Sequence, residues 1–278
     1  MANGAKPAQL DRTQYLKELA AKVLAAKLGP AAGADAADLE LFRKQIIARP
    51  DDLRRKLLGA NVQRRRLLEA TQRRALDLLD VTPDLLGPLG LLRYEGSHSR
   101  LVARFVDATT EPLLAAALLP AVLALVGADK HASPGDFRNA VVEHERWFVS
   151  GRVDISIALP KCLVLIEMKI DAEEGPDQLL RDRKELDAAK GTRAPVLVYL
   201  TLPGATKSSS GVDHVHITLD KLLLSWLPLA GTGGGSAEYL ARYLKSIALL
   251  VGCAGVGRFD DWTFTQQGAA LKLVEAIA

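Results

Sequence analysis

Cysteine is scarce in this sequence, which has only two, Cys162 and Cys253, among 278 residues. Two cysteines cannot build a disulfide framework, and neither lies in a spacing typical of a metal-binding motif. The scarcity argues against a disulfide-rich secreted protein, and we expect a cytoplasmic location.

Long hydrophobic runs are also missing. Every apolar stretch is broken by a charged residue or a proline before about 18 residues, the length that a membrane-spanning helix needs. The N-terminus, MANGAKPAQLDRTQYLKEL, has no apolar segment before a small-residue cleavage site. We therefore expect neither a signal peptide nor a membrane span. Aromatic residues make up 5% of the chain, and no aromatic ladder for stacking single-stranded bases is visible.

The composition that remains is that of a globular protein, with 49% hydrophobic and 25% charged residues. This is enough to bury one substantial core. The net charge is only +3, but residues 41–74 hold eleven Lys or Arg residues against three acidic ones. Such a local excess suits a polyanion, although a solvated helix face has the same pattern. The candidate contacts to a nucleic-acid backbone are Arg54, Arg55, Lys56, Arg64, Arg65 and Arg66.

The spacing of apolar residues divides the chain into a helical first part and a mixed second part. Steps of three and four predict helices in residues 9–29, 35–50 and 51–79. An Ala- and Leu-rich passage, residues 99–129, predicts two buried helices that meet near Pro112. Turn residues and β-branched runs predict the later elements: strands at 140–149, 152–159 and 162–170, a helix at 176–191, a strand at 195–202, and a C-terminal helical part including 236–252.

Two neighbouring strands, in GRVDISIALPKCLVLIEMKI (151–170), each carry one acidic residue in an apolar run. If the chain reverses about Pro160–Lys161, Asp154 and Glu167 become cross-strand neighbours. Their Cβ atoms would then lie roughly 4.5–5.5 Å apart, a spacing that penalises like charges with nothing between them. Lys169 shares that face because side chains alternate along a strand. The residues predicted to point into a core on the other side are Val153, Ile155, Val164, Ile166 and Met168.

Paired carboxylates of this kind suit a divalent cation, because the cation removes their repulsion. Hard cations such as Mg²⁺ prefer carboxylate and carbonyl oxygens. A bound cation polarises a phosphoryl oxygen and acidifies water, and Lys169 would orient that water or help to deprotonate it. This is chemistry for phosphodiester hydrolysis. The alternative is a wet sheet face on which Glu167 pairs with Lys169 or Arg152 and nothing binds, and a bulge in the hairpin would change the pairing.

Several motifs, taken in order, resemble the PD-(D/E)XK nuclease superfamily. GRVDI supplies the Asp, VLIEMKID supplies the E-x-K, and DQLLRDR leads into the helix that follows. Upstream, YEGSHSRLVARFVD is similar to the helix with an E-x-x-H-S pattern that precedes the core in one bacterial branch. The likeness covers roughly residues 91–203, and the residues that carry it are Glu95, His98, Ser99, Asp154, Glu167, Lys169 and Gln178.

The resemblance implies an α/β fold with a restriction-endonuclease-like core, αβββαβ, in which helices flank a central mixed sheet. It also implies cleavage of nucleic acid with a divalent metal, Mg²⁺ or Mn²⁺. Asp154, Glu167, the backbone carbonyl of Met168 and Glu95 would be the metal ligands. Lys169 would be the water-positioning base or electrophile.

Two further residues are implied by the resemblance. Gln178 matches the glutamine that begins the helix after the E-x-K strand in RecB-like members, where it orients the site or touches the substrate backbone. His98 lies one helical turn after Glu95, so it could hold a phosphate or assist Glu95, or it could simply cap the helix.

The sequence departs from the pattern at three places. Val153 replaces the proline of the PD motif, and Arg104–Phe105 stands where the upstream helix has a tryptophan. Asp182 replaces the tyrosine that follows the glutamine by four residues, which argues against substrate contact through this helix.

We predict a helical, basic region over residues 1–90 and a PD-(D/E)XK nuclease-like domain over residues 91–278. The expected activity is metal-dependent hydrolysis of phosphodiester bonds, with DNA preferred to RNA, in a bacterial defence or DNA-processing system. Many members of the superfamily dimerise to cut two strands, so a homo-oligomer is one expected form. The alternative is a catalytically silent nuclease fold that acts as a nucleic-acid-binding or assembly module.

Overall fold

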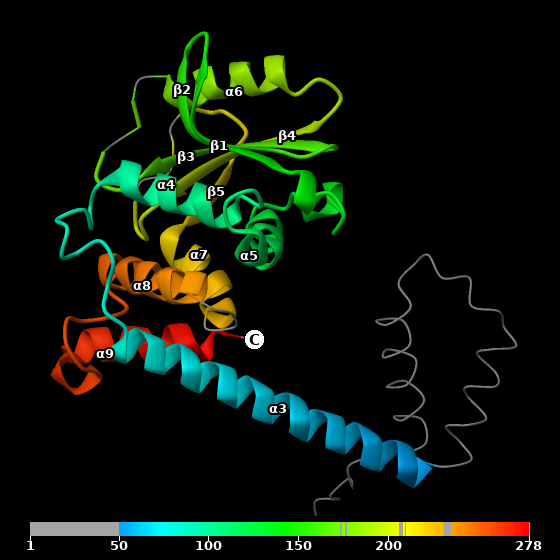
Figure 1. The fold of residues 1–278 in the computed structure, drawn as a ribbon, viewed down its shortest axis with the longest axis vertical. Coiled ribbons are helices and arrows are strands. Elements are labelled where there is room, and N and C mark those ends of the chain that lie inside the picture. The colour runs from blue at the N-terminus through cyan, green and yellow to red at the C-terminus, as the bar shows by residue number, and fades with distance from the viewer. Residues whose placement is uncertain are drawn as a thin grey trace, which may run out of the picture. The chain divides into compact units, whose positions relative to one another are not determined.

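The computed structural model describes residues 50–172, 174–175, 177–205, 208, 210–230 and 235–277, with side chains from Asn61 onward (Figure 1). The chain divides into two compact units, Met1–Arg64 and Arg65–Ala278, and the second contains the whole described sheet. The two helices expected before residue 50 lie outside the described residues. The assignment of separate roles to residues 1–90 and 91–278 stays a prediction.

The third predicted helix is present as α3 (Pro50–Val81). Its last turns are amphipathic: Ala75 and Leu79 are buried in the main core, while Arg73 and Arg74 are exposed. Each helix in the described part of the chain is too short or too polar to span a bilayer.

A five-stranded mixed sheet forms the centre of the second unit. The strands lie side by side in chain order, with β1, β2 and β3 antiparallel and β3, β4 and β5 parallel. This agrees with the mixed sheet expected from the sequence. The strands are β1 (Val141–Phe148), β2 (Gly151–Ala158), β3 (Cys162–Lys169), β4 (Ala194–Thr201) and β5 (Val215–Thr218).

Helices cover both faces of this sheet. In Figure 1, α4 lies against one face and α6 against the other, and α5 packs beside α4. Further helices pack behind α4 and α5, and α7 contacts both α5 and α8. The helices are α4 (Glu95–Val106), α5 (Pro112–Leu125), α6 (Gln178–Ala189), α7 (Leu219–Trp226), α8 (Gly235–Leu250) and α9 (Phe264–Glu275), with short 3-10 turns at Asp129–His131, Phe137–Asn139, Leu227–Leu229 and Phe259–Asp261.

The β2–β3 hairpin has the register predicted from its sequence. Ile155 pairs with Ile166, and the Leu159 N–H donates to the Cys162 carbonyl at 2.9 Å, which leaves Pro160–Lys161 as the turn. The β2–β3 ladder ends at the pair Ile155–Ile166. Asp154 and Glu167 are the next residues opposite each other, at the position where the two strands separate. Every residue of β3 is buried, which makes each charged group on it costly unless it is paired or used.

The prediction for Val153 was wrong. Ile155, Val164, Ile166 and Met168 lie in the main core on the α4 side, but Val153 packs with Leu179 and Leu186 of α6. The β1–β2 ladder skips the position of Glu145 and Asp154, and Glu145 has a φ of 55°. The regular alternation of β2 side chains between the two faces of the sheet is therefore interrupted at Asp154.

Candidate active site

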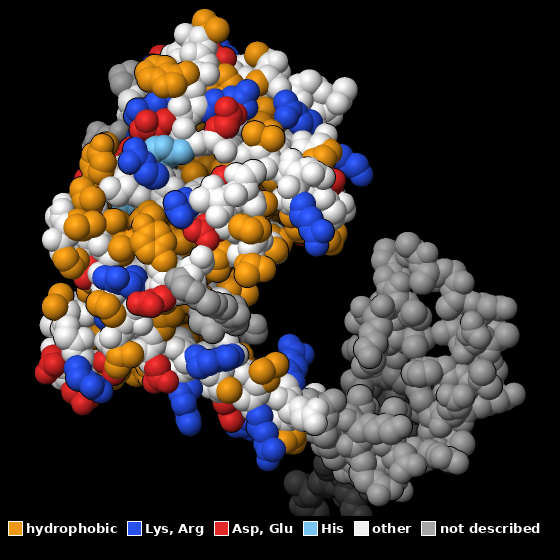
Figure 2. Space-filling view, viewed as in Figure 1, with side chains coloured by type: hydrophobic (Ala, Val, Ile, Leu, Met, Phe, Trp, Pro, Cys, Tyr) orange, Lys and Arg blue, Asp and Glu red, His pale blue; other side chains and the backbone are white. Residues whose placement is uncertain are grey.

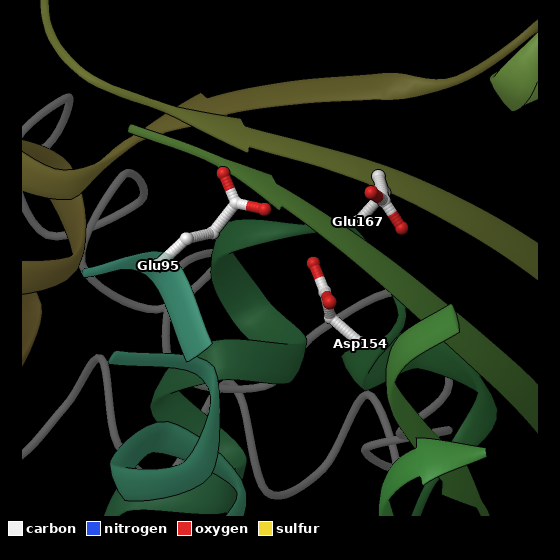
Figure 3. A group of neighbouring side chains, drawn as sticks. All are labelled: Glu95, Asp154 and Glu167. Atoms are coloured by element: carbon white, nitrogen blue, oxygen red, sulfur yellow. The ribbon is translucent and has the colours of Figure 1, made fainter. Parts of the chain in front are cut away.

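Three carboxylates from three different elements converge where β2 and β3 separate. Glu95 is the first residue of α4, Asp154 is on β2 and Glu167 is on β3 (Figure 3). Each offers an oxygen atom, and these oxygens lie within 4.8 Å of one another. Oxygen ligands bind Mg²⁺ or Ca²⁺ at roughly 2.0–2.6 Å, so the three oxygens are close enough to share one ion. The residues present therefore fit a hard divalent cation.

Asp154 is held in place by the backbone of the neighbouring strand. Its Oδ2 accepts a hydrogen bond from the Met168 N–H at 2.8 Å, and the side chain is buried. Burial raises the pKa of Asp154, and the Met168 hydrogen bond opposes that change. The ligand role implied for the Met168 carbonyl stays a prediction.

Glu167 is the most buried of the three acids, at 2% exposure. Its Oε1 accepts from the Lys169 ammonium at 2.5 Å and from the Gln178 amide, while its Oε2 has no hydrogen-bond partner among the described residues. Burial, with the charge of Asp154, raises the pKa of Glu167 to about 8. A buried carboxylate oxygen without a partner is an uncommon and costly arrangement that a cation would relieve.

Lys169 lies among the acids as predicted. Its Nζ is 2.5 Å from Glu167 Oε1 and 3.3 Å from Glu95 Oε1. Burial acts to lower the pKa of Lys169, but the charge and hydrogen bond of Glu167, helped by Glu95 and Asp154, raise it above the ordinary value. The choice between the base and the electrophile implied for Lys169 stays a prediction.

Glu95 is positioned by both the start of its helix and the end of β3. Its Oε2 accepts from the Ile170 N–H at 3.2 Å, and the positive end of the α4 dipole favours a carboxylate at this position. Arg93 donates to Asp171 at 2.8 Å, which ties the segment before α4 to the residue after Ile170.

Gln178 connects the start of α6 to the site. The preceding residue, Asp177, has a φ of 54°, and Gln178 Oε1 accepts from the Gly175 N–H at 3.2 Å. The same amide donates through Nε2 to Glu167 Oε1. A side chain fixed at one end by backbone and bonded at the other to a ligand orients that ligand.

His98 makes its contacts away from the carboxylates. Its Nε2 is 2.8 Å from the Leu92 carbonyl oxygen, its Nδ1 is 3.3 Å from the Tyr243 hydroxyl, and the residue is fully buried. Burial lowers the pKa of His98. These contacts favour the structural interpretation of His98, as a link between α4 and α8, over a catalytic one.

Ser99 has a partner that sequence reasoning missed. Its Oγ lies 3.1 Å from His144 Nε2 on β1, and it also donates to the Gly96 carbonyl at 3.3 Å. Ser99 is fully buried, so the pair joins α4 to β1 rather than facing solvent. No spacing along the chain could have brought together residues 45 positions apart.

The basic candidates lie on α3. The side chains of Arg54, Arg55 and Lys56 are outside the described residues, whereas Arg64, Arg65 and Arg66 are exposed. Arg65 pairs with Glu69 at 2.9 Å. Figure 2 shows Arg side chains standing out from the part of this helix whose side chains are described.

A family model described as the PD-(D/E)XK nuclease superfamily matches residues 84–245. This match spans more than half of the chain and contains Glu95, Asp154, Glu167, Lys169 and Gln178. The chain belongs to the PD-(D/E)XK nuclease superfamily. No curated protein and no solved structure matches it.

Membership of the PD-(D/E)XK superfamily explains why the described core is an α/β sheet with helices on both faces. It accounts for Asp154 as the Asp of the signature and for Glu167, Met168 and Lys169 as the E-x-K tripeptide. It also supports a nuclease type of activity and a nucleic acid as the general class of substrate. The signature does not account for Asp182, which is buried on α6.

Proposed function

We propose that this PD-(D/E)XK protein is a divalent-metal-dependent nuclease that hydrolyses phosphodiester bonds of DNA, with Mg²⁺ or Mn²⁺ as cofactor. The observation that carries the proposal is the convergence of Glu95, Asp154 and Glu167 within 4.8 Å, with the Lys169 ammonium bonded to two of them. A structural ion pair would need only one acid for one lysine. The surplus of buried carboxylate is what a cation site requires.

In this reaction a water oxygen forms a bond to phosphorus and gives up a proton to solvent, the bond to the leaving oxygen breaks, and that oxygen takes up a proton. A divalent cation bound by Glu95, Asp154 and Glu167 would supply Lewis-acid stabilisation of the charge on the phosphoryl oxygens. Lys169, as an ammonium, donates hydrogen bonds toward the reacting phosphate or orients the water. Gln178 holds Glu167 in the orientation that faces the site.

Plasmid nicking tests the proposal. We expect wild-type protein to convert supercoiled plasmid to the nicked form with Mg²⁺ or Mn²⁺ and to be inactive with EDTA. Lys169→Ala should lower the rate by roughly 10²-fold or more, because it removes a group that contacts the reacting atoms. Lys184→Ala, which changes an exposed lysine on α6, is the matched control and should cleave like wild type.

Equal metal-dependent cleavage by wild type and Lys169→Ala would reject the assignment of the site. Parallel assays with duplex DNA, single-stranded DNA and RNA of one sequence test the preference for DNA, which would be wrong if RNA were cut faster. A role in bacterial defence or DNA processing, a cytoplasmic location and a homo-oligomeric form remain part of the proposal.

A second candidate is a catalytically silent module that binds nucleic acid or assembles with partners. Asp182 favours it, because this residue stands where the resemblance leads one to expect a tyrosine that contacts the substrate. The retained acids and Lys169 argue against it. Binding of DNA without cleavage in Mg²⁺ and in Mn²⁺ would favour this second candidate.

A further inference from the structure

The hairpin that joins β1 to β2 carries an exposed aromatic side chain near its turn. Trp147 is 74% exposed, and Val149, at the turn itself, is entirely exposed. The other two tryptophans of the chain, Trp226 and Trp262, are buried. A single exposed apolar residue says little by itself, so its place relative to the candidate active site decides what it can do.

The register of the hairpin places Trp147 close to the site. Trp147 pairs with Arg152, which precedes Asp154 by two residues on β2. With a rise of about 3.3 Å per residue and a spacing of about 5 Å between paired strands, the Cα atoms of Trp147 and Asp154 are less than about 10 Å apart. A nucleic-acid strand with a phosphate at the carboxylates can therefore reach Trp147 with a neighbouring nucleotide.

Trp147 lies on the face of the sheet from which Glu95 approaches the site. Phe148 and Val153 pack toward α6, and Trp147, which precedes Phe148 on β1, projects from the opposite face. That face is covered by α4, whose first residue is Glu95 (Figure 1). Tyr94, immediately before Glu95, is 62% exposed, so a second aromatic ring is open to solvent next to the site.

An arginine accompanies the Trp147 ring. The guanidinium carbon of Arg152 is 5.9 Å from the centre of this ring, and Arg152 also pairs with Glu145 at 3.0 Å. Arg152 is exposed, and most of the Trp147 ring remains open to solvent. An open aromatic ring beside a guanidinium group is an arrangement that stacks a base and binds the adjoining phosphate.

We propose that Trp147 stacks on an unpaired base of single-stranded DNA, beside the phosphodiester bond that the site cleaves, with Arg152 at an adjoining phosphate. The proposal rests on the proposed function in that this strand is the substrate of the nuclease. Base pairs inside a duplex are stacked on each other, whereas an unpaired base offers its face to an aromatic ring. The substrate class that follows is a single strand, or a single-stranded end of a duplex.

Tryptophan fluorescence tests this contact without any cleavage. In EDTA, oligo(dT) should quench the emission of the wild-type protein, because a base stacked on the exposed Trp147 ring quenches its fluorescence and the other two tryptophans are buried. A blunt duplex of equal length should quench it less. Trp147→Phe keeps a ring for stacking but removes the exposed fluorophore, so it should bind oligo(dT) without this quenching.

Affinity separates stacking from charge, and fluorescence anisotropy in EDTA measures it. Trp147→Ala should bind oligo(dT) about 5- to 150-fold more weakly, and Trp147→Phe should retain most of the affinity. A strand of equal length without bases should bind wild type and Trp147→Ala equally. Phe264→Ala, which removes a more exposed ring on α9, is the matched control and should bind oligo(dT) like wild type.

Equal affinity of wild type and Trp147→Ala for oligo(dT), or an equal loss of affinity for the strand without bases, would overturn the proposal. So would a wild-type emission that responds to anionic lipid vesicles and not to oligo(dT), since the hairpin would then contact a membrane. Failure of the proposed function is a separate outcome: it would appear as absent cleavage of every DNA by a protein whose Trp147 emission is still quenched by oligo(dT).

Discussion

Among the residues of this site, Glu167 is the one whose burial is expected to cost the most folding free energy. In the metal-free protein, burial and the charge of Asp154 raise its pKa to about 8, so the folded state holds a proton that the unfolded chain releases at lower pH. Stability from this group is therefore complete below the ordinary carboxyl range and declines as the pH rises to about 8. The decline is at most about 1.4 kcal/mol per pH unit for one proton.

Urea unfolding in EDTA at several pH values between 5 and 8 measures this effect. We expect the free energy of unfolding of wild type to fall with pH and that of Glu167→Gln to fall less steeply. Asp182, with a pKa raised to about 7, contributes in the same direction and remains in the variant. Identical pH slopes for the two proteins would show that Glu167 is ionised in the folded state throughout this range.

The roles of some residues could be predicted from the sequence around them, and those of others could not. Asp154, Glu167 and Lys169 were identified because charges in apolar strands require a partner, and the hairpin turn fixed which charges meet. Asp182 was noted only as a departure from a pattern, because neither its burial nor its free oxygen is visible in a helix sequence.

Among the elements, the start of α6 does the most to orient the site. The Gln178 side chain accepts a hydrogen bond from the Gly175 N–H and donates one to Glu167 Oε1. Gln178→Ala would therefore leave the Glu167 carboxylate in place but free to rotate.

Loss of a residue that orients a ligand typically costs about 10–100-fold in metal affinity. We expect that loss in calorimetric titration with Mn²⁺, while Gln267→Ala, which changes a glutamine of α9 that donates to the Phe259 carbonyl, should bind like wild type. Unchanged affinity in Gln178→Ala would mean that Lys169 alone is sufficient to orient Glu167.

Elements with strong local signals were predicted and those defined by distant contacts were not. α3 to α6 and β1 to β4 follow from apolar periodicity and from turn residues such as Pro160 and Gly191. β5 has only four residues, and it is a strand because it pairs with β4. α7 begins at the next residue, without a loop between them. The interruption at Glu145, which moved Val153 to the α6 side, likewise arises from strand pairing.

At the scale of the whole molecule, charge is distributed unevenly although the total is only +3. Within the second unit, Arg66 and Arg73 are exposed and lie seven residues apart on α3, two turns along one face of the helix. They are about 10 Å apart along the helix axis, at 1.5 Å per residue. Their exposure leaves both guanidinium groups open to solvent, which agrees with a role in binding a phosphate backbone.

Salt dependence tests this role directly. Removing one cationic side chain that binds a phosphate should reduce the slope of log affinity against log salt by about 0.9 for duplex DNA. Arg66→Ala combined with Arg73→Ala should therefore bind duplex DNA more weakly in EDTA, with a slope shallower by about 1.8, in fluorescence anisotropy. Lys221→Ala combined with Lys272→Ala removes the same charge from exposed positions on α7 and α9 and should leave the slope unchanged. Equal slopes for both double variants would mean that general charge, rather than this face of α3, attracts the nucleic acid.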